Sequence, residues 1–138
     1  MTGARLKRPR TLIVDDERDT LELYGESLRD AGWSVSIAET GDEALMIAPI
    51  VSPDVIVMDL AMPGLDGFQT MQRLKLDPRT TRIPIVVLTA ATNEESGRRA
   101  ARTGAQLVLT KPYAANRLQA VLEAIVTRPP PAPGQQRG

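Results

Sequence analysis

Polar residues that could do chemistry stand directly after short apolar runs: Asp15 and Asp16, Asp59, Thr89 and Lys111. Adjacent carboxylates at the edge of a core repel each other and are costly to bury. Carboxylate oxygens suit a hard cation such as Mg²⁺, which also takes water and phosphate oxygens as ligands. A hydroxyl and an ammonium close by suit the oxygens of a phosphate. Together these residues predict an acidic Mg²⁺ site that accepts a phosphoryl group.

Taken singly, each residue also has a purely structural interpretation. Asp16 could cap the helix that follows it, because a side-chain oxygen there satisfies free N–H groups. Thr89 could be a strand-end or turn residue, and Lys111 a solvated charge before a proline. Only their joint position at the ends of apolar runs favours a common site.

The elements that must position these residues alternate along the chain. Short runs rich in Val, Ile and Leu predict strands at Thr11–Val14, Ser34–Ala38, Asp54–Met58, Pro84–Leu88 and Gln106–Leu109. Apolar residues at helical spacing predict helices at Glu17–Ala31, Gly41–Ala48, Asp66–Leu76, Asn93–Arg102 and Ala114–Val126. The second helix is expected to stop before Pro49, and Gly97 weakens the fourth.

Five strand–helix units predict an α/β fold, a doubly wound five-stranded parallel sheet with five helices on its two faces. Ligands of such sheets bind beyond the carboxyl ends of the strands. The five polar residues follow those ends, so we expect them to meet at one edge of the sheet.

Composition excludes several kinds of chemistry. The 138 residues include no His and no Cys, which excludes imidazole catalysis, thiolate metal sites and disulfides within this chain. The 17 basic residues balance the 17 acidic ones, and aromatics make up 3%, so we expect neither direct nucleic-acid binding nor membrane insertion. A cysteine-free chain suits a cytoplasmic location.

The predicted organisation is one domain between two loose ends. Residues 1–10 form a short arm that contains four Arg or Lys residues, and we expect it to be flexible. The globular domain is predicted over 11–127. Residues 128–138 are rich in proline and are expected to be disordered, so we expect no output domain among the residues after Val126 in this sequence.

Four motifs carry a resemblance to a known family: "VDDE" (Val14–Glu17), "VMDLAMPGLDG" (Val57–Gly67), "VLTAA" (Val87–Ala91) and "TKPY" (Thr110–Tyr113). Each is weak alone, but their order at strand ends is specific. From Thr11 to about Val126 the chain resembles the receiver domains of bacterial two-component response regulators, including the single-domain chemotaxis regulators. The resemblance implies a flavodoxin-like sheet of strand order 2-1-3-4-5.

The resemblance also implies roles for residues of the site. Asp59 matches the phosphoacceptor, which takes a phosphoryl group from a phosphohistidine on a sensor histidine kinase or phosphotransfer protein. Asp16 matches the direct ligand of Mg²⁺, and Asp15 matches the carboxylate that reaches the ion through water. Ala61 would supply its backbone carbonyl to the same ion.

Two further residues match the part of the family site that responds to phosphate. Thr89 matches the hydroxyl that follows the phosphate, and Lys111 matches the ammonium that pairs with it. The Lys111–Pro112 bond is implied to be cis. Such a protein catalyses only its own phosphorylation and dephosphorylation.

The output face implied by the family comprises the fourth helix, the fifth strand and the fifth helix, which would act on an unknown downstream protein. Val108 departs from the family here, because this switch position usually holds Tyr or Phe. Valine is stiff and small, so we expect a shift of the fourth helix rather than an aromatic swing.

Three other interpretations remain open. A phosphatase that forms an aspartyl phosphate would have an Asp-x-Asp motif, whereas Ala61 stands two residues after Asp59. A binding module that works without phosphorylation would not need the full acidic set. The chain could also be an isolated receiver from a longer regulator.

Overall fold

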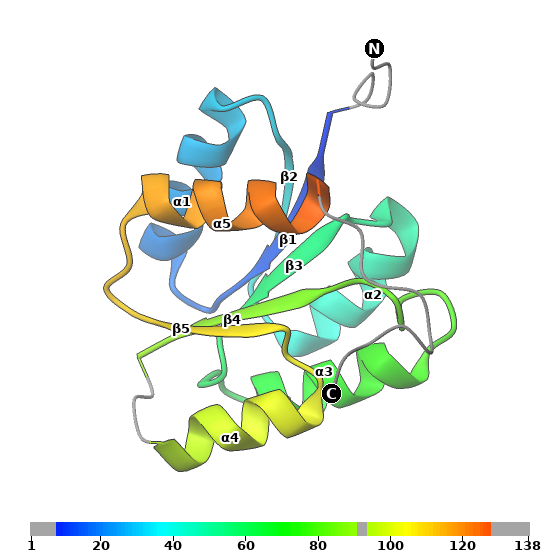
Figure 1. Cartoon of the computed structure of the whole chain (residues 1–138). Helices are drawn as coiled ribbons and strands as arrows, with labels where there is room; N and C mark the ends of the chain where they lie inside the picture. Colours follow the sequence, from blue (N-terminus) through cyan, green and yellow to red (C-terminus); the bar gives the residue numbers. More distant parts are fainter. Residues whose placement is uncertain (1–7, 91–93, 128–138) are drawn as a thin grey trace.

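Strands and helices alternate strictly along the chain in the computed structural model, which describes residues 8–90 and 94–127 (Figure 1). The strands are β1 (Arg10–Val14), β2 (Ser34–Ala38), β3 (Val55–Met58), β4 (Ile85–Thr89) and β5 (Leu107–Thr110). The helices are α1 (Arg18–Asp30), α2 (Gly41–Val51), α3 (Gly67–Leu76), α4 (Glu94–Thr103) and α5 (Ala115–Thr127).

The sheet has the order β2-β1-β3-β4-β5, and every pair of neighbouring strands is parallel. This confirms the predicted fold class and strand order. The three central strands are almost completely buried, as their continuous apolar runs predict. All strands point the same way, so their carboxyl ends share one edge (Figure 1).

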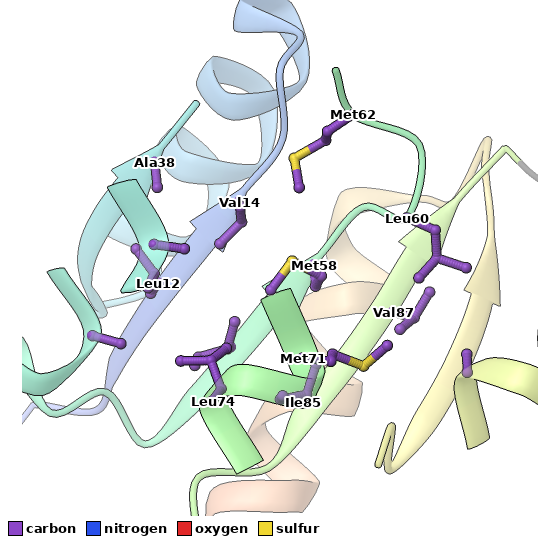
Figure 2. Close-up of a cluster of buried hydrophobic side chains, with 14 residues drawn as sticks. Leu12, Val14, Ala38, Met58, Leu60, Met62, Met71, Leu74, Ile85 and Val87 are labelled. Carbon is purple, nitrogen blue, oxygen red and sulfur yellow. The ribbon is translucent and has the colours of Figure 1, made fainter. Parts of the chain in front are cut away.

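Side chains of the central strands alternate between two apolar layers. Leu12, Ile56 and Ile85 join the layer formed with α2, α3 and α4, part of which Figure 2 shows. Ile13 and Val57 join the layer formed with α1 and α5. The alternation fixes the rotation of each strand, and therefore the direction in which its last residue points.

Helix ends follow local signals in the sequence. At the start of α3 the Asp66 carboxylate accepts the backbone N–H of Gln69, whose side chain accepts the N–H of Asp66. This reciprocal capping box fixes the entry into α3. Helix α1 is followed by Gly32 at a positive φ of 98°, a conformation that favours glycine.

Two expectations from the sequence are wrong. Helix α2 continues through Pro49 to Val51. Pro49 removes only its own backbone donor, and Ser52, the residue after the helix, still donates its N–H to the carbonyl of Ala48. Arg10, expected in the flexible arm, begins β1; its N–H binds the Asp54 carboxylate.

The other predicted bounds match the observed ones or differ from them by one residue, and the second strand, Ser34–Ala38, matches at both ends. The rest of the arm, the tail and residues 91–93, where the fourth helix was expected to begin, lie outside the described residues. No helix among the described residues is long and apolar enough to span a bilayer.

Candidate functional site

The three predicted carboxylates meet at the carboxyl edge of the central strands. Asp15 follows β1 and is 3% exposed, while Asp59 follows β3 and is 6% exposed. Asp16 is exposed beside them. One oxygen from each lies within 4.8 Å of the others, which is close enough for one cation to bind all three.

Lys111 reaches this cluster from the end of β5. Its Nζ lies 2.8 Å from Oδ2 of Asp15 and 3.7 Å from Oδ2 of Asp59. The Lys111 N–H donates to the carbonyl of Thr89, which joins the ends of β4 and β5. The predicted cis bond between Lys111 and Pro112 is confirmed.

Burial and the ion pair act in opposite directions on the pKa of Asp15, and also on the pKa of Lys111. Burial raises the pKa of Asp15 above its ordinary value, outweighing the hydrogen bonds from Lys111 and from the N–H of Glu17. Burial also lowers the pKa of Lys111, but the hydrogen bond to Asp15 and the charges of Asp15, Asp59 and Glu17 together raise it. The lysine therefore stays charged, and its ion pair offsets only part of the cost of burying the Asp15 carboxylate.

Thr89 and Ala61 lie at the same edge of the sheet as Asp59. Thr89 is the last residue of β4 and is 1% exposed, rather than following the strand as expected. The N–H of Ala61 points to Oδ1 of Asp59 at 3.4 Å, so the loop after β3 curls back over the acceptor candidate.

The interpretation of Asp16 as a helix cap is wrong. The residue at the N-cap of α1 is Glu17, and no side chain caps this helix. Asp15 instead accepts the N–H of Glu17 at 2.9 Å. Asp16 is thereby left without a capping role and is available to a metal ion.

Sequence reasoning missed two contributions to the site. Glu17 places a carboxylate oxygen 3.7 Å from Lys111 Nζ. Gly67 packs so closely behind the acceptor candidate that a Cβ would overlap the carbonyl of Asp59 and lie 2.7 Å from Cα of Leu60. Both residues lie inside the recognised motifs, but only the fold shows which atoms they approach.

The site and the fold together define a class: a doubly wound α/β domain with an acidic cluster and one lysine at the carboxyl edge of its sheet. The sequence profile of the response regulator receiver domain matches residues 11–123. The chain therefore belongs to the receiver domain family of the two-component response regulators.

Relatives and solved structures agree with this assignment. The chain is 36% identical over 120 residues to the DNA-binding dual master transcriptional regulator RpaA of Synechocystis, covering 87% of the chain and 50% of RpaA. It thus spans about half the length of that relative.

Two solved structures share the fold over nearly their full length. Chemotaxis protein CheY4 of Vibrio cholerae is similar with a TM-score of 0.82 and 30% identity, over 86% of this chain and 99% of that one. The receiver domain of the Pseudomonas aeruginosa sensor histidine kinase PA1611, solved with a magnesium ion in its active-site cleft, has a TM-score of 0.81 and 25% identity. That match covers 88% of this chain and 100% of the other.

Proposed function

We propose that Asp59 accepts a phosphoryl group from a histidine kinase or phosphotransfer protein in the presence of Mg²⁺. Receiver domains are phosphoacceptors with weak autophosphatase activity. The observation that carries the assignment to Asp59 is the position of its carboxylate, next to Asp15 and Asp16 and 3.7 Å from Lys111.

The donor set fits magnesium. Three carboxylates from two strand ends supply the hard oxygen ligands that this ion prefers, and the backbone carbonyl of Ala61 would add a fourth. Asp16 and Asp59 would bind the ion directly, and Asp15 through water. When bound, Mg²⁺ neutralises charge on the phosphoryl oxygens.

In the proposed transfer, a carboxylate oxygen of Asp59 attacks the phosphorus. The P–O bond forms as the P–N bond of the phosphohistidine breaks, and its electron pair stays on the imidazole nitrogen. Lys111 is charged and close enough to pair with a phosphoryl oxygen, and Thr89 offers its hydroxyl to another. Attack by water later returns the carboxylate and releases inorganic phosphate, so the only turnover is that of the protein's own acyl phosphate.

We further propose that the face formed by α4, β5 and α5 transmits the signal to a downstream protein. Val108 is half-buried and packs against the layer below α4, while Tyr113 packs on the opposite layer with α1 and α5. Position 108 has no aromatic ring that could swing inward, so the proposed response relies on a shift of α4.

Incubation with acetyl phosphate and Mg²⁺, followed by intact mass measurement, tests the proposal. We expect a gain of one phosphoryl group that disappears on adding a chelator. The gain should vanish in Asp59→Asn and persist in Asp30→Asn, which makes the same change at an exposed residue at the end of α1. Labelling of Asp59→Asn, or no labelling of the native chain, would overturn the assignment.

A further inference from the structure

A shallow groove of about 480 Å³ lies beside the acceptor site, between the β3–α3 loop and α4. Residues 60–63 of the loop, Asp66 and Phe68 of the α3 start, and Arg99 of α4 line it. Leu60 and Met62 are buried and anchor the loop in the core, as Figure 2 shows, so Ala61 and Pro63 are held outward. The groove is thus mainly apolar and is already formed in the chain alone.

One fixed cation stands at the wall of this groove. The guanidinium carbon of Arg99 lies 3.9 Å from the centroid of the Phe68 ring, a cation–π contact that holds the planar group in place. Its neighbours Arg98 and Arg102 form ion pairs with Glu94 and Glu95. Within residues 8–90 and 94–127, Arg99 pairs with no carboxylate.

The acidic residue of the groove does not meet this charge, because the Asp66 carboxylate caps α3 through the N–H of Gln69. Stacking on a ring occupies the face of a guanidinium and leaves its N–H edge free to bind a carboxylate with two hydrogen bonds. The groove therefore offers an apolar surface next to an unused anion-binding group.

Helix α4, which supplies the Arg99 wall of the groove, lies in the more basic part of the chain. Residues 67–127 include nine Lys or Arg and four Asp or Glu, whereas residues 9–66 include three and thirteen. Seven residues line the groove, too few for a stable interface between folded domains, which takes about 20–30 residues on each side. A short segment of chain is the occupant that fits.

We propose that this groove docks a short partner segment in which a large apolar residue is followed by an acidic one. The apolar side chain covers Ala61, Pro63 and the ring of Phe68, and the carboxylate binds Arg99. This docking is separate from phosphorylation of Asp59 and does not require it.

The probe is the peptide GSWEEG, acetylated and amidated at its ends, titrated into the ¹⁵N-labelled chain without Mg²⁺ or phosphodonor. We expect saturable shifts of the amides of Ala61, Phe68 and Arg99. Arg99→Gln should weaken binding by about five- to tenfold, the loss of one charge-assisted pair. The control Arg98→Gln removes the same charge one residue away and should change the affinity less than about twofold.

Two variant peptides separate the contributions. GSAEEG, without the indole, and GSWQQG, without the carboxylates, should each bind at least about fivefold more weakly. Equal losses in the two arginine variants, or equal binding of GSAEEG, would reduce the effect to general attraction between charges and overturn the proposal. Absence of any shift would do the same.

Two further measurements test whether a second copy is the occupant and whether binding depends on Asp59. If these amides shift as the protein concentration rises in the absence of peptide, the occupant is a second copy of the chain instead. Binding of GSWEEG should persist in Asp59→Asn, so failure of the phosphoacceptor assignment leaves this result intact.

Discussion

At the scale of single residues, the site combines attraction between Lys111 and the carboxylates with repulsion among the carboxylates. Lys111 compensates Asp15 at 2.8 Å, but one lysine faces four carboxylates, those of Asp15, Asp16, Asp59 and Glu17. Burial leaves Asp15 with a raised pKa despite its ion pair. An acidic cluster of this kind is better explained by binding a cation than by stabilising the fold.

Removing one of the repelling charges tests this balance. Asp16 is exposed and forms no helix cap, so Asp16→Ala deletes a charge with little loss of packing. Without Mg²⁺ we expect a melting temperature about 1–3 °C above that of the native chain, since exposed charge interactions contribute below about 1 kcal/mol. With Mg²⁺ the order should reverse. A variant that melts lower than the native chain in a chelator would contradict the repulsion.

The Tyr24 hydroxyl forms a hydrogen bond with the turn that follows Lys111. The Tyr24 hydroxyl on α1 donates to the carbonyl of Tyr113 at 2.6 Å, across 89 positions of sequence. Tyr24→Phe leaves that partly buried carbonyl without its donor and should cost about 1 kcal/mol in the free energy of unfolding. Tyr113→Phe, which removes a hydroxyl that donates no such bond in the described chain, should change stability by less than about 0.5 kcal/mol. Urea unfolding of both variants gives the comparison, and equal losses would contradict it.

At the scale of elements, most of the fold was predictable because each strand and helix carries its own signal. Continuous apolar runs indicated buried parallel strands, and residues at their ends indicated the site. Pro49 misled because it removes only its own backbone donor and only two residues of the helix follow it. The groove at Arg99 was not predictable, since a stacked and unpaired arginine has the same sequence signal as a solvated one.

Two glycines in helices make a matched prediction at this scale. Gly97 lies inside α4, where a Cβ would meet nothing within 4 Å, so Gly97→Ala should stabilise the chain by about 0.5–1 kcal/mol. Gly67→Ala makes the same change at the start of α3, where the Cβ would overlap the Asp59 carbonyl. It should cost more than about 2 kcal/mol and weaken phosphorylation. Thermal melts of both variants decide it, and changes of the same sign would show that space around the Cβ does not govern them.

If a shift of α4 transmits the signal, Gly97→Ala should also affect the response to phosphate. A firmer α4 resists rearrangement, because the phosphate can shift the equilibrium only by its differential stabilisation of the two states. Amide hydrogen exchange in α4 before and after phosphorylation should therefore change less in Gly97→Ala than in the native chain. Equal changes in the two proteins would place the moving element elsewhere.

At the scale of the whole molecule, charge is divided along the chain although the total is zero. The acidic first part supplies the carboxylates through β1 and β3, and the basic second part supplies Lys111 through β5. The fold brings these parts together at one edge of the sheet, so the site lies where the two charge distributions meet. The basic part continues across α3 and α4, where the groove at Arg99 lies.

Rising pH should have opposite effects on the stability of the whole domain through Asp15 itself and through bound Mg²⁺. Because burial raises the folded-state pKa of Asp15 above its unfolded value near 3.8, the folded chain binds a proton more tightly than the unfolded one. Without metal, this group's contribution to stability falls as pH rises through that folded-state pKa, and recovers as pH falls. Bound Mg²⁺ requires the deprotonated carboxylate and stabilises the fold by mass action, so its effect should be largest near neutral pH and shrink on acidification. Melting temperatures with millimolar Mg²⁺ and with chelator, from about pH 8 down to about pH 4, measure the difference. The same series on Asp59→Asn should show a smaller metal effect, and a metal effect independent of pH would place the ion away from these carboxylates.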